Sequence, residues 1–259
     1  MNWKLPLISL VAIIVGGAWY FHNAEKLEPT NSASHSVALP LPPQVAQEGA
    51  SEESDGPAPL PAGATPPKVA VPDNLDNSDA AVQKALSDLA PQITQWLMPE
   101  AQIRKWVMLV DQVADGAVQR EYRPLNYPMP PFQIRHGGDK LLLDPSNYQR
   151  ATLLINVVTA IPPARLAPYY RTWYPRLNEA YRELGRGGGF DKRLHLAIDR
   201  ILAAQPLTGT PELIRPSVYY KYADSEYENA SDLQKFLWRI GPDNTLRLQK
   251  YLRSFEQAL

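Results

Sequence analysis

The stretch "RELGRGGGFDKRLHLAIDRIL", residues 182–202, places four glycines within five positions, directly before a helical pattern. Glycine-rich turns that open into helices can bind phosphate through their backbone amides. A phosphate-binding P-loop needs a strand before the glycines and Lys-Ser/Thr after them. Here a helical pattern precedes the glycines, and Asp191 puts a negative charge where the phosphate would lie. The sequence therefore favours a flexible connector, with Gly185 ending one helix, over a phosphate site.

Three ionisable residues follow the glycines on one stripe of the expected helix. Asp191, His195 and Asp199 lie four residues apart, and carboxylates and imidazoles are ligands for zinc and other divalent ions. The stripe borders the apolar face, where flanking polar residues are normally hydrated, and a metal site would need further ligands that the sequence does not identify. We therefore predict no metal site, no cofactor and no catalytic residue.

The segment "APYYRTWYPRLNEAYRELG" is rich in aromatic residues. Tyr174 and Tyr181 lie at the edge of a helical stripe that contains Trp173, and their rings could stack on a sugar or a peptide. The same spacing also fits a buried core face. We keep Tyr174 and Tyr181 as a candidate binding surface, with burial in the core as the alternative.

The segment "RIGPDNTLRLQKYLR", residues 239–253, has the outline of a helix-hairpin-helix, a module that holds the DNA backbone with turn amides. That motif has a glycine on each side of the turn hydrophobe, and Arg239 replaces the first one. A glycine that ends one helix and a proline that begins the next explain the same turn without a ligand.

Common catalytic patterns are absent from the sequence. No Gly-x-Ser-x-Gly, Ser-x-x-Lys or His-Glu-x-x-His occurs, and the lack of cysteine excludes thiol nucleophiles, disulfides and thiolate metal sites. The cluster "DSEYE", residues 224–228, could resemble the acid pair of a glycosidase, but adjacent acids in a loop usually serve solubility. We expect a protein that is not an enzyme.

The formal net charge of -1 hides an uneven distribution. Residues 22–79 carry two lysines and nine acidic residues, whereas residues 80–259 carry 23 Lys and Arg against 18 Asp and Glu. A mildly basic domain therefore follows an acidic segment. A positive excess of this size is not typical of a dedicated nucleic-acid binder, so we do not expect nucleic acid as a partner.

The run Leu5–Phe21 contains no charged residue. A helix of this length is about 25 Å long, at the lower limit for spanning a bilayer core. A cleaved signal peptide is the alternative, since Gly16 and Ala18 have the spacing of a cleavage site, but the bulky Trp19 would follow the cut. We favour an uncleaved anchor in contact with the lipid bilayer, and Lys4 places the N-terminus in the cytoplasm.

The composition changes twice after the anchor. Ten prolines fall between Pro29 and Pro72 among Ala, Ser, Glu and Gly, and no aromatic residue occurs between Phe21 and Trp96. Such a segment cannot bury enough apolar area to offset the entropy of ordering. We therefore expect residues 22–79 to be a disordered linker that precedes the folded domain.

Helical periodicity dominates from residue 80 onward, with a small β contribution. Gly137-Gly138 between "FQIR" and "KLLL" is typical of a hairpin turn, and "PSVYYKYAD" alternates like a strand that Pro216 places at a sheet edge. We therefore predict a mainly α domain with a small β component (α+β). The expected helical faces are Val82–Ile93, Ile103–Val113, Tyr148–Ile161, Leu166–Leu184, Phe190–Ile201, Leu233–Ile240 and Leu248–Phe255.

Several segments together resemble a proteobacterial family of membrane-anchored proteins with a C-terminal helical domain of unknown function. They are "EYRPLNYP", "LDPSNYQR", "WYPRLNEAYRELG", "FDKRLHLAIDRIL", "PSVYYKYAD" and "QKFLWRIGPDNTLRLQKYLR". Family members carry a less glycine-rich turn where this chain has "RGGGF". The resemblance implies a bacterial inner-membrane protein with a hydrophilic C-terminal domain, and it implies no activity.

These observations predict three segments: a signal-anchor transmembrane helix over residues 1–21, the linker over 22–79 and the helical domain over 80–259. We expect a single-pass inner-membrane protein with a cytoplasmic N-terminus and a periplasmic domain that binds an unidentified envelope protein. Two alternatives stay open. One is a membrane-anchored nucleic-acid-binding module that uses the helix-hairpin-helix-like segment, and the other is an enzyme that acts on the cell wall.

Overall fold

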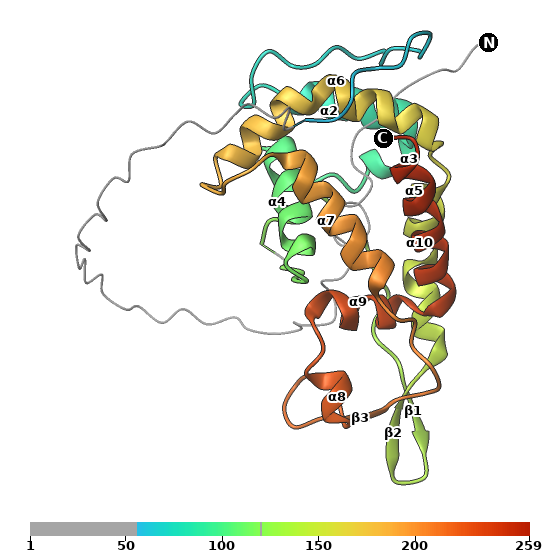
Figure 1. Ribbon diagram of the computed structural model, residues 1–259. Helices are drawn as coiled ribbons and strands as arrows, with labels where there is room; N and C mark the ends of the chain where they lie inside the picture. Colours follow the sequence, from blue (N-terminus) through green and yellow to red (C-terminus); the bar gives the residue numbers. More distant parts are fainter. Residues whose placement is uncertain (1–55, 120) are drawn as a thin grey trace, which may run out of the picture.

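The computed structural model describes residues 56–119 and 121–259, which form packed helices with a small antiparallel sheet at one end (Figure 1). The α+β class predicted from the sequence is confirmed. The helices are α2 (Asp79–Leu89), α3 (Pro91–Thr94), α4 (Gln102–Ala114), η2 (Pro145–Ala151), α5 (Thr152–Thr159), α6 (Pro163–Arg182), α7 (Phe190–Ala203), α8 (Ser225–Glu228), α9 (Asp232–Ile240) and α10 (Pro242–Glu256). The strands are β1 (Ile134–Gly137), β2 (Lys140–Leu143), β3 (Glu212–Ile214) and β4 (Lys221–Tyr222).

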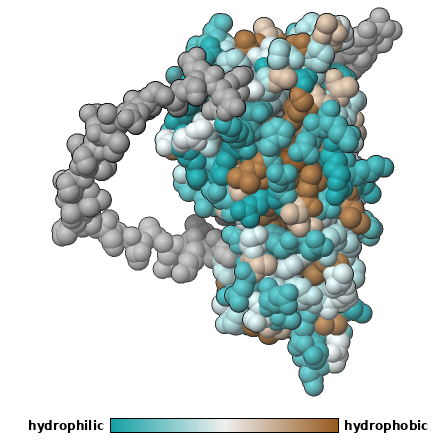
Figure 2. Space-filling view, in the orientation of Figure 1, coloured by the Kyte–Doolittle hydropathy of each residue, from teal (hydrophilic) through white to brown (hydrophobic). Residues whose placement is uncertain are grey.

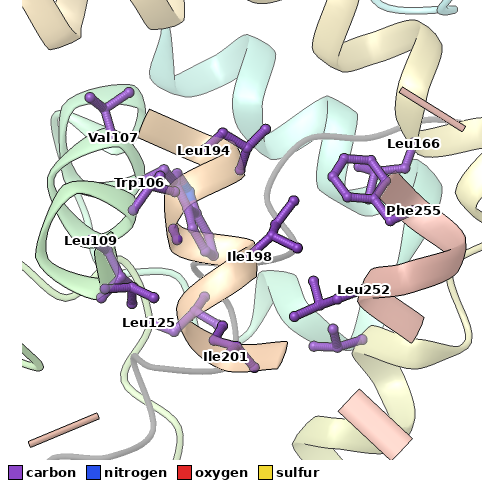
Figure 3. Close-up of a cluster of buried hydrophobic side chains, with 14 of the residues drawn as sticks. Trp106, Val107, Leu109, Leu125, Leu166, Leu194, Ile198, Ile201, Leu252 and Phe255 are labelled. Atoms are coloured by element: carbon purple, nitrogen blue, oxygen red, sulfur yellow. The ribbon is translucent and has the colours of Figure 1, made fainter. Parts of the chain in front are cut away.

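The main core forms where the apolar stripes of α4, α6, α7 and α10 meet (Figure 3). Trp106 of α4, Ile198 of α7 and Leu252 of α10 are each at most 3% exposed. Their spacing of three or four residues from other apolar residues gives each helix one buried face. Burial of these faces, more than intrinsic helix propensity, stabilises the arrangement.

The four strands follow one another in the order β1-β2-β3-β4, and every neighbouring pair is antiparallel. Ile134 pairs with Leu143 across the β1–β2 hairpin, whose turn includes Gly138 at φ +66°. Leu143 and Tyr222 pack with Trp238 of α9 in a second, smaller apolar cluster. This cluster connects the sheet to the helical body.

Local signals in the sequence set several helix ends. Asp144 accepts a hydrogen bond from the backbone N–H of Ser146 and so caps η2, as the "DPSN" pattern predicts. Gly241 is the single residue between α9 and α10. The helix expected over Val82–Ile93 is instead interrupted before Pro91, because proline lacks the backbone N–H that an uninterrupted helix needs there.

The β component differs from the sequence prediction in extent. β4 contains only two residues, although it does lie at an edge of the sheet. β3 was not expected, because three residues are too few to show a period of two. The alternation in "PSVYYKYAD" therefore overstates the length of the strand.

The predicted membrane anchor, Leu5–Phe21, lies outside the described residues. Within residues 56–119 and 121–259, no single helix is long and apolar enough to cross a bilayer; η2–α5 and α6 reach the required length and hydropathy only as a pair bent by 74°. On the face in Figure 2, apolar atoms form small groups separated by hydrophilic ones. The large apolar side chains that are exposed are Tyr122, Leu153, Leu196, Ile214, Val218 and Leu246.

Candidate interaction surface on α6

One face of α6 presents polar atoms of large side chains to a neighbouring segment of the chain. Tyr169, Trp173 and Arg176 lie four and three residues apart, so they share one face of the helix. The rings of Tyr169 and Trp173 belong to the main core and are at most 2% exposed, whereas the Arg176 side chain is partly exposed. The phenol, the indole N–H and the guanidinium form a row along α6.

Residues 68–76, here called the strap, run along this row in an irregular conformation, with bends at 68–69 and 73–75 on either side of residues 70–72. The N–H of Val69 donates to the Tyr169 hydroxyl at 2.9 Å, and the indole N–H of Trp173 donates to the Val69 carbonyl at 3.3 Å. Arg176 Nε donates to the carbonyl of Pro72 at 2.9 Å, and its Nη2 donates to the carbonyl of Asp73 at 2.6 Å. The side chains of α6 therefore bind the main chain of the strap.

Apolar side chains anchor the strap between these hydrogen bonds. Leu75 is 4% exposed and belongs to the main core, Pro72 is buried, and Val69 and Val71 are partly buried against the same core. Asp73 is exposed, so the aliphatic side chains face inward while the charged one faces solvent.

Polar contacts at the end of the strap and just after it position α2 and α4. Asp76 forms an ion pair with Arg104 at 2.9 Å, and Arg104 also pairs with Glu183 at 2.6 Å. The hydrogen bond from Arg104 lowers the pKa of Glu183. Asp79 accepts a hydrogen bond from the N–H of Gln102 at 2.8 Å, at the start of α4.

Burial raises the pKa of Tyr169 to about 12, while the N–H of Val69 acts in the opposite direction. The phenol therefore stays protonated throughout the neutral range. A neutral hydroxyl can accept the Val69 N–H without placing a charge against the core.

This packing begins before the predicted boundary at residue 80. The average composition of residues 22–79 hides the three aliphatic residues of the strap, and residues 22–55 lie outside the described part of the chain. The signal in the sequence was the apolar pattern in "VAVPDNL", whose spacing fits neither a helix nor a long strand.

The two tyrosines predicted as a binding surface lie in different environments. Tyr181 is 4% exposed and packs on Phe190, with ring centroids 6.0 Å apart. Tyr174 is partly buried, and Gly56 lies so close that an added Cβ would be 2.7 Å from a carbon of the Tyr174 ring. The structure therefore does not bring Tyr174 and Tyr181 together on one open surface, because Tyr181 belongs to the core.

The stripe at Asp191 joins three helices. The Tyr170 hydroxyl donates to Asp191 at 2.6 Å, and burial together with this carboxylate raises the pKa of Tyr170. His195 lies 3.8 Å from Asp191 and 3.6 Å from Glu256 of α10, whereas Asp199 is exposed and takes no part. No group of ligands suited to a metal ion occurs among the residues described.

The glycine run connects α6 with α7, and an ion-pair network holds it on α4. Arg193 contacts Asp111 and Asp115, each at 2.6 Å, and Arg186 contacts the same two carboxylates at 3.0 Å. The first N–H of α7, at Phe190, already donates to the side chain of Asn178. The loop thus has the features of a structural connector, and its helix-start amide is occupied by the protein itself.

The turn between α9 and α10 is covered. Gly241 has φ +89° and ψ 161°, and a Cβ there would lie 2.6 Å from Tyr148 Cβ. Asn244 Nδ2 donates to the carbonyls of Tyr148 and Ile240 at 2.9 Å. Arg239 lies over the Tyr222 ring. A helix-hairpin-helix needs open turn amides, and this turn is instead packed against η2.

A cavity of about 290 Å³ lies beside the same turn. It is lined by Pro145, Tyr148, Gln149, Thr152, Pro242, Asp243, Asn244 and Arg247. Arg247 already donates to Asn156. In the acidic cluster at residues 224–228, Asp224 caps α8, and Glu228 accepts the N–H of Tyr222, so these two carboxylates have structural partners.

The fold and this surface define a small α+β domain in which one helix binds an irregular segment through its side chains. The chain belongs to the family described as protein of unknown function DUF3014, whose model matches residues 102–256, more than half of the chain. The match confirms the resemblance at the level of an uncharacterised family. Searches of curated proteins and of solved structures gave no significant match.

Proposed function

We propose that this chain is a single-pass protein of a bacterial inner membrane that presents its helical domain in the periplasm and acts there by binding another envelope protein, without catalysis. The uncharged run Leu5–Phe21 serves as the anchor in this proposal. Lys4 precedes the run and favours a cytoplasmic N-terminus.

The α6 face is the observation that supports protein binding most directly. Tyr169, Trp173 and Arg176 form hydrogen bonds with the main chain of a non-helical segment. Main-chain groups are common to all polypeptides, and neighbouring pockets for alternate side chains supply specificity in extended-peptide recognition. A helix face of this chemistry suits a protein partner better than a sugar or a phosphate.

Reporter fusions test the membrane topology. Alkaline phosphatase and a fluorescent protein are fused separately to Leu259 of the full chain. An active phosphatase and a dark fluorescent protein are expected, because phosphatase matures outside the cytoplasm. An inactive phosphatase together with a bright fluorescent protein would contradict the periplasmic assignment.

Site-specific cross-linking in intact cells tests protein binding. A photoreactive residue at position 165, which is exposed and lies one turn before Tyr169 on the same face of α6, should give a discrete adduct with an envelope protein. The matched position is 139, in the exposed turn of the β1–β2 hairpin at the opposite end of the molecule (Figure 1). Equal adducts at both positions, or none at position 165, would argue against a partner on α6.

A further inference from the structure

We infer that the α6 face is an exchangeable docking site for an acidic, proline-containing peptide, and that the strap occupies this site in cis. This inference rests on the proposed protein-binding function and names the chemistry of the partner. Binding of the partner then requires that residues 68–76 leave α6, so the chain carries a competitor for its own ligand.

The contacts of the strap define the peptide that fits. Tyr169 and Trp173 form hydrogen bonds with the main chain of Val69. Arg176 donates two more, to the carbonyls of Pro72 and Asp73. The aliphatic positions Val69, Val71 and Leu75 face the core, and Asp76 pairs with Arg104. A matching ligand therefore has aliphatic residues at these spacings, a proline and a following acid, and it can adopt the bends of the strap.

The basic residues of the site keep partners when the strap leaves. Arg176 Nη1 also pairs with Glu179 at 2.5 Å, and Arg104 Nε pairs with Glu183 at 2.6 Å. Loss of the strap therefore leaves no buried charge uncompensated, which is the usual obstacle to breaking a buried ion pair. Among the described residues, the strap joins no sheet, so no β-ladder fixes it in place.

The α6 face lies inside the residues that the family model matches, and the strap lies outside them. Tyr169, Trp173 and Arg176 lie within the matched residues 102–256, whereas the strap precedes them. The docking face thus belongs to the region that defines the family, and its occupant lies outside that region.

Cis occupancy determines how strongly a free peptide competes. A segment joined directly to α2 has an effective concentration on the order of 1 mM or more at α6. A free peptide sees only the fraction of molecules whose face is open, and its apparent affinity falls by that fraction. Weakening the strap without altering α6 should therefore strengthen peptide binding.

Fluorescence anisotropy of the full chain tests this expectation. The probe is a labelled synthetic peptide, "PPKVAVPDNLDN", which corresponds to residues 66–77. The variant Val69→Asp/Leu75→Ser should bind the peptide at least tenfold more tightly than the wild type. Adding Arg176→Gln to this variant should remove the gain, because the donors to the carbonyls of Pro72 and Asp73 are lost.

Equal binding to the wild type and the weakened variant would overturn the inference, as would no binding to a weakened variant that remains folded by circular dichroism. If that variant unfolds, native-state hydrogen exchange of the wild type decides. The Val69 amide should exchange faster than core amides of α7, through local opening. Exchange only by global unfolding would make the strap an integral part of the fold.

The outcomes separate this inference from the proposed function. Peptide binding without any adduct at position 165 would support the docking face and oppose an envelope protein as its partner. An adduct at position 165 together with no peptide binding to the folded, weakened variant would oppose the exchangeable strap alone.

Discussion

Individual side chains on α6 are buried in the core, yet each directs one polar atom toward the strap. Tyr169 is 2% exposed, yet its hydroxyl accepts the N–H of Val69. Trp173 is fully buried, and its indole N–H donates to the Val69 carbonyl. Large aromatic side chains suit this role, because they bury a large area and still carry one polar group at the edge.

Replacing Tyr169 with Phe should lower the free energy of unfolding by about 1 kcal/mol, because the partly buried Val69 N–H loses its acceptor. Chemical denaturation measures the loss, and faster amide exchange at Val69 locates it. Tyr122→Phe is the matched control, since Tyr122 is 41% exposed and should change stability by less than about 0.5 kcal/mol. The same loss in both variants would contradict the role of the hydroxyl.

Gly241 occupies a backbone region that is essentially restricted to glycine. Gly241→Ala should cost about 3 kcal/mol or more, because an added Cβ meets both this restriction and Tyr148. Gly187→Ala is the control, since no atom lies within 4 Å of its added Cβ and its φ is ordinary. Thermal unfolding compares the two, and a mild effect at position 241 would contradict the tight turn.

At the scale of elements, the connector between α6 and α7 depends on charge as well as on glycine. Arg186 and Arg193 reach from the loop and α7 to Asp111 and Asp115 on α4. The hydrogen bond from Arg193 lowers the pKa of Asp115 below its ordinary value of 3.8. Asp115 therefore links the stability of this junction to pH.

Asp115→Asn should destabilise the chain by about 0.5–1 kcal/mol at pH 7, a surface-pair magnitude because the Asp115 side chain is 43% exposed. Because the pKa of Asp115 is lower in the folded than in the unfolded chain, its ionised carboxylate stabilises the fold above about pH 3.8. This stabilisation is lost as the pH falls through the pKa of the folded chain. Urea unfolding from pH 7 to pH 2.5 should show the two chains converging below about pH 3.8. Asp139→Asn, in the exposed hairpin turn, is the control, and a difference independent of pH would oppose the ionic origin.

The elements also show what the sequence could and could not predict. Long helices such as α4 and α7 carry several periods of apolar residues, so their positions followed from the spacing. β3 and β4 have too few residues to carry a period, and their pairing depends on contacts distant in sequence. The strap depends on a few aliphatic residues whose partners lie about 100 positions later, which local patterns cannot reveal.

The whole molecule contains a folded unit that starts earlier than composition indicates. A chain shortened to residues 68–259 should unfold within a few degrees of the full chain. A chain of residues 80–259 should lose roughly 3 kcal/mol, or about 10 °C in Tm, because Leu75, two partly buried valines and their hydrogen bonds are removed. Calorimetry of both chains checks this, and equal midpoints would show that residues 68–79 contribute no stability.

The docked strap also sets the reach of the protein. In the proposed membrane-anchored arrangement, the residues of the strap cannot help to span the distance from the bilayer while the strap is bound. Release of its nine residues adds about 30 Å of extended chain. The domain would then reach farther from its anchor. Binding of a ligand on α6 would therefore increase the distance from the membrane at which the bound complex can lie.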